Sequence, residues 1–278
     1  HGNFTLDEDV NGKLKSWKVP ENTFTAAKKV TLRGLLSHTA GLTVHGFPGY
    51  AVGAPIPTLI DILKGTAPAN TKAILADIEP GSRMRYSGGG YTVMQQLMMD
   101  RTGWSFPQIM ERMVLSRLGM KRSTYEQPLP KDWHSNAATA HLRDGTPVKG
   151  NWHVYPEMAA AGLWTTPSDL ARWAIELWSA YRGTSNRILE RNTAREMCTR
   201  QSIQSGSVSA GLGVQLHGDP PVAFGHGGSN EGFKCNLLMY LESGNGIVVM
   251  TNGDRGEAIA SAVTRAAIEE YDWPALPK

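Results

Sequence analysis

The sequence lacks several features that would assign a class of protein at once. Its longest apolar runs, such as residues 247–250, are the length of a strand, whereas a membrane-spanning helix needs about 20 apolar residues. Cys198 and Cys235 are the only cysteines in 278 residues and lie far apart, which argues against a disulfide framework and a cysteine metal site. The net charge of +3 is spread along the chain rather than gathered in one run. We therefore expect no membrane span within these residues and no nucleic-acid-binding surface.

Several catalytic motifs are missing as well. The chain has no Gly-x-Ser-x-Gly elbow, no His-Glu-x-x-His zinc helix and no phosphate-binding glycine-rich motif. The eight histidines show no ligand spacing, so we expect no metal site and no cofactor. No signal peptide follows His1, and the sequence leaves the localisation unknown.

The residues that are present predict a folded α+β protein. Hydrophobic residues make up 41% of the chain and charged residues 19%, which suits a sizeable core beneath a polar surface. Residues 1–80 are rich in loops. Apolar spacing then predicts a helix over 90–102, ended by Gly103, and a second over 106–118. Thr166-Pro167-Ser168-Asp169 is typical of a helix start, because Thr166 can cap the helix that Pro167 begins.

The last part of the chain predicts a sheet. From residue 211 the apolar period changes to two, with short strands expected over 212–216, 222–224, 235–241 and 247–251. A final helix over 257–271 would place a stripe containing Ile259 and Val263 against that antiparallel sheet. Because helices and strands are segregated along the chain, the arrangement is α+β.

Two glycine-rich segments could carry chemistry. Tyr86 precedes Gly88, Gly89 and Gly90, whose lack of side chains could hold the tyrosine in an open cleft. The alternative is a glycine-rich helix entry with Tyr86 packed on the core. His226 lies between Gly225 and Gly227, where it could be exposed at a strand edge beside free backbone N–H groups, or could be a solvated loop residue.

The neighbours Ser37 and His38 suggest a nucleophile and its base. Adjacent residues point in different directions, however, and catalytic triads are assembled in space, so we reject this pair.

Taken together, these segments resemble the serine hydrolase superfamily of class C β-lactamases, DD-peptidases and esterases. Residues 30–42 look like its Leu-Leu-x-His-Thr-Ser-Gly-Leu signature. Tyr86-Ser87-Gly88 takes the place of Tyr-x-Asn, and His226-Gly227-Gly228 takes the place of Lys-Thr-Gly. Further matches follow in the same order at residues 118–120, 161–170 and 248–252.

The resemblance implies acyl-enzyme chemistry on an ester, amide or β-lactam, without a cofactor. Tyr86 would be the general acid and base, and His226 would replace the usual lysine. Gly88, Gly227, Gly228 and Ser229 would bind substrate, with the Ser229 N–H in the oxyanion hole. Gly88 in place of asparagine, and a histidine that is largely neutral near pH 7, favour an esterase or peptidase over an efficient β-lactamase.

The family's Ser-x-x-Lys nucleophile motif does not occur in these residues. Thr25-Ala26-Ala27-Lys28 fits only with threonine, and we treat it as coincidence because it lies in a loop rather than opening an apolar helix. Residues 2–10 look like the family segment that follows the nucleophile's helix. We therefore expect the nucleophilic serine upstream of this chain.

Our leading hypothesis is a single catalytic domain over 1–278 that lacks its N-terminal part, with a mainly helical region over about 40–200 and strands and a helix over 207–278. It would act on a small-molecule or peptide substrate, and an N-terminal segment or another chain would fill the missing place. These residues alone would be inactive.

The rival hypothesis is a truncated, non-catalytic binding or vestigial protein. If the first is right, Tyr86 and His226 should lie within roughly 10 Å in one cleft, so that one substrate group can contact both.

Overall fold

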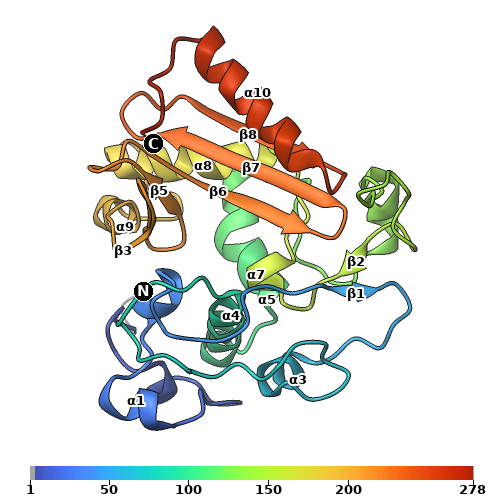
Figure 1. Ribbon diagram of the computed structural model, residues 1–278, viewed down its shortest axis with the longest axis vertical. Coiled ribbons are helices and arrows are strands. Elements are labelled where there is room, and N and C mark those ends of the chain that lie inside the picture. The colour runs from blue at the N-terminus through green and yellow to red at the C-terminus, as the bar shows by residue number, and fades with distance from the viewer. Residues whose placement is uncertain (1–3, 278) are drawn as a thin grey trace. The chain divides into compact units, whose positions relative to one another are not determined.

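The computed structural model describes residues 4–277, which form two compact units. The first unit contains the chain up to residue 110 together with residues 125–128 and 154–163. The second contains residues 111–124 and 129–153 and the chain from residue 164 onward. The first contains short helices, and the second combines helices with a six-stranded antiparallel sheet, which gives the predicted α+β arrangement (Figure 1).

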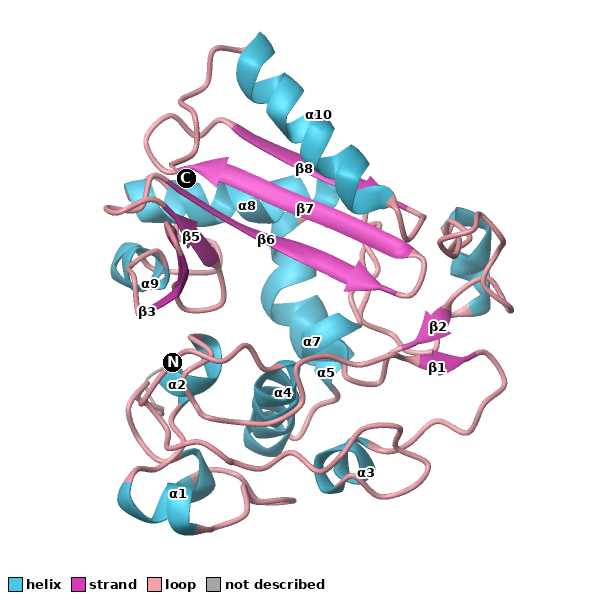
Figure 2. Cartoon of the chain, in the orientation of Figure 1, coloured by secondary structure: helices cyan, strands magenta, loops and turns pink. Residues whose placement is uncertain are grey.

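Short helices joined by long loops make up most of the first unit (Figure 2). Its elements are a 3₁₀ turn η1 (Val10–Gly12), α1 (Thr23–Ala27), α2 (Leu32–Leu36), the two-residue strand β1 (Tyr50–Ala51), α3 (Leu59–Lys64), α4 (Gly88–Thr102), α5 (Phe106–Met110) and α7 (Met158–Ala161). The strand β2 (His153–Val154) stands at the boundary between the two units in the sequence.

Helix α4 is the longest element of the first unit, and the sequence defines both of its ends. The Ser87 side chain caps its start by accepting a hydrogen bond from the Gly90 N–H at 3.0 Å. Gly103 ends it in the left-handed conformation with φ 72°, which a glycine adopts without the cost that a side chain would bring. The predicted helix over 90–102 is therefore confirmed, with two further residues at its start.

Helix α4 is buried on more than one side, because its buried residues include Thr92, Val93, Gln95, Gln96 and Leu97. Val93 and Leu97 belong to the core of the first unit, together with Leu35, Leu42 and Ile74. The polar Gln95 is also buried, and its amide bonds Pro156 O at 3.1 Å and the Ala159 N–H at 3.0 Å. These two bonds fix the start of α7 beside α4, because a buried amide without partners would be costly.

The second unit contains the predicted helix that begins after Thr166. Helix α8 (Pro167–Arg182) starts where the Thr166 hydroxyl accepts a hydrogen bond from the Asp169 N–H. The predicted helix over 106–118 is instead interrupted: α5 is followed by a π-helical turn η2 (Glu111–Leu115) and by α6 (Ser116–Leu118). The unit also contains the 3₁₀ helix η3 (Lys131–Asn136) and helix α9 (Arg191–Met197).

The sheet of the second unit is antiparallel throughout and has its strands in sequence order. The strands are β3 (Ser202–Ser205), β4 (Val208–Ala210), β5 (Gln215–His217), β6 (Ala223–Asn230), β7 (Phe233–Tyr240) and β8 (Gly246–Thr251). The sequence predicted β5 to β8 but not β3 and β4, whose residues are mostly polar or small.

Alternate residues of the strands form two apolar layers on opposite faces of this sheet. Phe224, Leu237 and Met239 pack with residues of α8 and α9. Leu238 and Tyr240 pack with Ile268 of the final helix α10 (Gly256–Glu270). The sheet of this unit is therefore covered by helices on both faces, with α8 on one side and α10 on the other (Figure 1).

The orientation that we predicted for α10 is wrong. Ile259 and Val263 are 58% and 44% exposed, and the alanines beside them at 258, 262 and 266 are exposed as well. The buried side of α10 is instead lined by Gly256, Ala260 and Thr264. Small residues face the sheet because they let the helix approach closely, and the larger aliphatic stripe faces away from it.

No helix among the described residues is long and apolar enough to cross a membrane.

Candidate active site

Tyr86 lies directly before the first turn of α4, in a cluster of aromatic rings from the first unit. Its ring stacks on His38 with centroids 4.0 Å apart and an interplanar angle of 28°, and it lies 4.9 Å from the ring of His45. Tyr86 is half-buried, and burial raises the pKa of its hydroxyl. The tyrosine is therefore held in one orientation as a neutral phenol, which can donate a proton.

His38 is a positioning residue for Tyr86 that we did not identify from the sequence. Its backbone is left-handed, with φ 57°, and its Nδ1 accepts a hydrogen bond from the Ser87 N–H at 3.1 Å. The imidazole thereby links the segment of residues 30–42 to the start of α4. The place of His38 in the Leu-Leu-x-His-Thr pattern was the sequence signal for this role. We considered His38 only as a partner for Ser37.

The serines next in sequence to His38 and Tyr86 form structural hydrogen bonds. Ser37 Oγ donates to Arg33 O at 2.8 Å. Ser87 Oγ caps α4 and donates to Thr43 O at 2.8 Å. Both side chains are buried. A serine whose hydroxyl proton already bonds a backbone carbonyl is a poor nucleophile, which supports our rejection of Ser37.

Gly88 is buried beneath the loop of residues 43–47. Its N–H donates to His45 O at 2.9 Å, and a Cβ added at this position would lie 3.1 Å from that oxygen and 3.2 Å from the Phe47 ring. The backbone donor of Gly88 is thus already in use. The asparagine that the family pattern has at this place does not fit here without movement of the loop.

His226 lies inside β6, where it pairs with Leu237 of β7. We predicted a strand that ends at residue 224, followed by a turn, and that boundary is wrong because β6 continues to Asn230. The glycines serve close packing rather than a turn: a Cβ at Gly225 would lie 2.1 Å from Leu237 O, and one at Gly228 would lie 2.5 Å from Cys235 Sγ.

The imidazole of His226 has a defined tautomer. Its Nδ1 lies 2.5 Å from Gly227 O, and because a carbonyl oxygen only accepts, Nδ1 carries the hydrogen. Burial lowers the pKa of His226, and the contact with Gly227 raises it to a smaller extent. The lowered pKa keeps the ring largely neutral at pH 7.

The segment after His226 extends past its neighbouring strand. Strand β5 pairs with β6 only as far as Gly225, whereas β7 pairs with β6 up to Asn230. On the side of β5, Gly227, Gly228 and Ser229 therefore have no strand partner among the described residues. Such an edge offers backbone donors and acceptors to an extended substrate or to an oxyanion.

The segment Thr25-Ala26-Ala27-Lys28, which fits the Ser-x-x-Lys pattern only with threonine, has structural roles. Thr25 is buried in α1 rather than in a loop as we predicted, and its hydroxyl completes the capping box with Asn22. Lys28 forms an exposed ion pair with Glu79 at 3.4 Å. Neither residue is arranged as a nucleophile beside its base.

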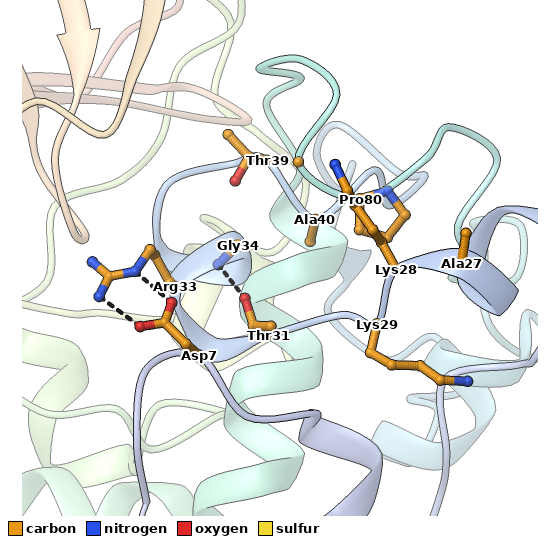
Figure 3. A pocket seen from close by; sticks show the side chains of 11 residues that line it. Asp7, Ala27, Lys28, Lys29, Thr31, Arg33, Gly34, Thr39, Ala40 and Pro80 are labelled. Atoms are coloured by element: carbon orange, nitrogen blue, oxygen red, sulfur yellow. Dashed lines mark hydrogen bonds and ion pairs between the residues drawn. The ribbon is translucent and has the colours of Figure 1, made fainter.

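A hollow of about 450 Å³ in the first unit is not lined by Tyr86 (Figure 3). Its positive side chains are paired with carboxylates: Arg33 with Asp7 at 2.6 Å, Lys29 with Glu21 at 3.1 Å, and Lys28 with Glu79. No site residue that the sequence suggested lines it. Its lining is Asp7, Ala27, Lys28, Lys29, Thr31, Arg33, Gly34, Thr39, Ala40, Pro80 and Gly81.

Within residues 4–277, no group of three or more His, Cys, Asp or Glu side chains is arranged to bind a metal ion. Cys198 and Cys235 are both free thiols. Tyr86 belongs to the first unit and His226 to the second, so their separation stays a prediction.

Comparison with known proteins gives the class of this chain. It is 26% identical over 154 residues to the D-alanyl-D-alanine-carboxypeptidase/endopeptidase AmpH of Escherichia coli K12, an alignment that covers 54% of this chain and 37% of that protein. It is 25% identical over 265 residues to protein flp of Staphylococcus aureus MW2, covering 90% of this chain and 48% of that protein. The crystal structure of a penicillin-binding protein from Bacillus halodurans superposes with a TM-score of 0.72 at 20% identity, over 95% of this chain and 78% of that one.

These matches define an α+β fold of the β-lactamase and transpeptidase type. The sequence model of the β-lactamase family matches residues 1–271, and this chain belongs to that family, within the superfamily of serine hydrolases and DD-peptidases. The resemblance seen in the sequence is thus confirmed. The chain spans less than half the length of these two curated relatives.

Proposed function

We propose that this chain is the larger part of a serine hydrolase that works through an acyl-enzyme, with a nucleophilic serine supplied by residues outside these 278. The observation that carries the proposal is the fixed Tyr86 hydroxyl at the start of α4, beside two serines that are both engaged by backbone carbonyls. Tyr86 could transfer protons, and neither of the described serines beside this segment, Ser37 and Ser87, has a hydroxyl available as the nucleophile.

In the proposed reaction the serine oxygen attacks the carbonyl carbon of the substrate, and its proton passes through the Tyr86 hydroxyl to the leaving group. Water then attacks the acyl-enzyme, and the serine regains its proton. The backbone N–H of Ser229, on the open edge of β6, would form part of the oxyanion hole. Proton transfer of this kind contributes about 10²–10⁴-fold to a rate.

The neutral His226 argues for the class of substrate. A lysine at this place would attract a carboxylate on the substrate, whereas a neutral imidazole carries no charge to do so. We therefore propose an ester or a peptide rather than a β-lactam as the preferred substrate. Because one relative is named a D-alanyl-D-alanine-carboxypeptidase/endopeptidase, peptides ending in D-alanine belong in the first set of substrates to test.

The test compares these residues alone with the natural gene product that contains them. Each is incubated with p-nitrophenyl esters and with a fluorescent penicillin, and adducts are located by mass spectrometry. We expect no adduct and no turnover for residues 1–278 alone, and an adduct on a serine outside them in the natural product. In that product Tyr86→Phe should lower turnover by about 10²-fold or more, whereas Ser87→Ala should mainly lower stability.

An adduct on Ser37 or Ser87 would overturn the proposal. A natural product with no further serine nucleophile and no turnover would favour the alternative, a non-catalytic binding protein that kept the fold.

A further inference from the structure

His45 is a second imidazole beside Tyr86, and the reaction described above gives it no role. Its ring centroid lies 4.9 Å from that of Tyr86, with an interplanar angle of 45°. The side chain is exposed, and its ring nitrogens form no hydrogen bond with another residue between 4 and 277. A nitrogen with a lone pair is therefore available to water at this place.

The backbone around His45 is held in an unusual conformation. Val44 has φ 65°, in the left-handed region that a β-branched residue rarely adopts. Val44 O accepts a hydrogen bond from the Gly89 N–H at 3.0 Å, and His45 O accepts one from the Gly88 N–H at 2.9 Å. A conformation of this kind persists only where the surroundings determine it, and such residues cluster at active sites. These bonds to the start of α4 fix the place of His45 beside Tyr86.

Tyr86 is suited to give a proton rather than to take one. Burial raises the pKa of its hydroxyl, so the phenol stays protonated and can serve the leaving group when the acyl-enzyme forms. Hydrolysis of the acyl-enzyme makes the opposite demand, because water has to lose a proton as it attacks the acyl carbon. Two groups in different environments commonly divide such tasks between them.

His38, the other imidazole beside Tyr86, is unsuited to this second task. It is buried, and its Nδ1 already accepts the Ser87 N–H at 3.1 Å. The lone pair is engaged, and the ring hydrogen is on Nε2. His45 differs from it on both points, because it is exposed to the water that the reaction consumes and has no such bond.

We propose that His45 is the general base that activates water for hydrolysis of the acyl-enzyme, an inference that rests on the proposed acyl-enzyme function. The water gives a proton to the unprotonated nitrogen of His45 while its oxygen forms a bond to the acyl carbonyl carbon. The bond from that carbon to the serine oxygen then breaks, and the imidazolium returns the proton to this oxygen. A carboxylic acid leaves, and both the serine and His45 are regenerated. Tyr86 is the acid of the first step, and His45 is the base of the second.

The test separates the two steps in the natural gene product that contains these residues. After rapid mixing with a p-nitrophenyl ester, the burst of p-nitrophenol reports formation of the acyl-enzyme and the steady rate reports its hydrolysis. His45→Ala and His45→Asn should show a burst, accumulate an acyl-enzyme visible by intact mass, and hydrolyse it about 10²-fold or more slowly than the parent. His134→Ala removes an exposed histidine of the second unit and should leave both steps unchanged.

Chemical rescue distinguishes a base from a residue that only supports the loop. Free imidazole should restore hydrolysis in His45→Ala, because a small base can enter the space that the side chain leaves, and thermal melts of all variants report the fold. Hydrolysis by His45→Asn at the parent's rate would overturn this inference and leave the acyl-enzyme proposal standing, as would a slow His45→Ala variant that imidazole does not rescue. A natural product that forms no acyl-enzyme would overturn both.

Discussion

Glu157 is the residue whose environment gives the clearest dependence on pH. Its carboxylate is fully buried at the start of α7, and neither oxygen has a well-aligned hydrogen-bond partner among the described residues. Burial raises the pKa to about 7 from an ordinary value of 4.5, and the Glu157 N–H and the Tyr50 hydroxyl offset this only in part. The folded chain therefore binds more protons than the unfolded chain between these values. Stability is lost as the pH rises from about 4.5 through 7.

We expect Glu157→Gln to remove this loss. At pH 8 the variant should be more stable than the parent by on the order of 3 kcal/mol, and at pH 4.5 the two should be nearly equal. Urea denaturation at both values measures the difference. Glu176 is a matched control, because its buried carboxylate accepts hydrogen bonds from the Ser185 hydroxyl and the Arg187 N–H. Glu176→Gln should destabilise, and a gain at pH 8 from that change would contradict this explanation.

The packing around Gly88 predicts that a larger residue at this position lowers the stability of the fold. Gly88→Asn restores the asparagine of the family pattern but places a Cβ against the loop at His45 and Phe47. Overpacking of this kind costs about 1–3 kcal/mol. Thermal melts should show the loss, whereas Gly12→Asn, at a position with open space around it, should cost less. An unchanged melting temperature for Gly88→Asn would show that the loop moves freely.

At the scale of elements, α8 depends on its N-cap. Thr166→Ala removes the acceptor for the Asp169 N–H and should lower the free energy of unfolding by about 1 kcal/mol. Thr166→Ser keeps the oxygen and should cost much less. Denaturant unfolding of the three proteins measures both differences, and equal losses for alanine and serine would assign the effect to the methyl group of threonine instead.

Local signals predicted the helices better than the strands. Thr166 and Gly103 define ends of α8 and α4 through hydrogen bonds and backbone angles that depend on only a few neighbouring residues. Strand β6 was predicted too short because glycines usually indicate a turn, while here they allow contact with Leu237 and Cys235 on a neighbouring strand. That contact depends on how two neighbouring strands pair, and no pattern within a single strand reports it.

The exposed face of α10 shows a related difficulty. Apolar periodicity identifies a stripe but does not identify what covers it. The small residues Gly256, Ala260 and Thr264 face the sheet, and the larger aliphatic residues face away. In the candidate site, Tyr86 and His226 were predicted from the order of motifs along the chain, and their roles stay predictions. No role was predicted for His38, because its contact with Tyr86 depends on stacking with a residue 48 positions later.

At the scale of the whole molecule, the proposed chemistry requires the two units to act on one carbonyl group. We expect cysteines introduced as Tyr86→Cys and His226→Cys, in a background with Cys198 and Cys235 replaced by alanine, to be joined by a cross-linker of roughly 10 Å. This distance allows a small substrate group to contact both side chains. Peptide mass spectrometry detects the intramolecular link. Efficient labelling of each single cysteine without any link in the double variant would separate the two residues and remove the shared site.

The contact of Gly88 with the loop of residues 43–47 also has a consequence for redesign of this chain. A Cβ at position 88 would lie 3.1 Å from His45 O and 3.2 Å from the Phe47 ring, so the loop would have to shift by a few tenths of an ångström to admit any side chain. A variant that introduces asparagine at position 88 is therefore best combined with a smaller side chain at position 47, so that the two changes compensate in volume.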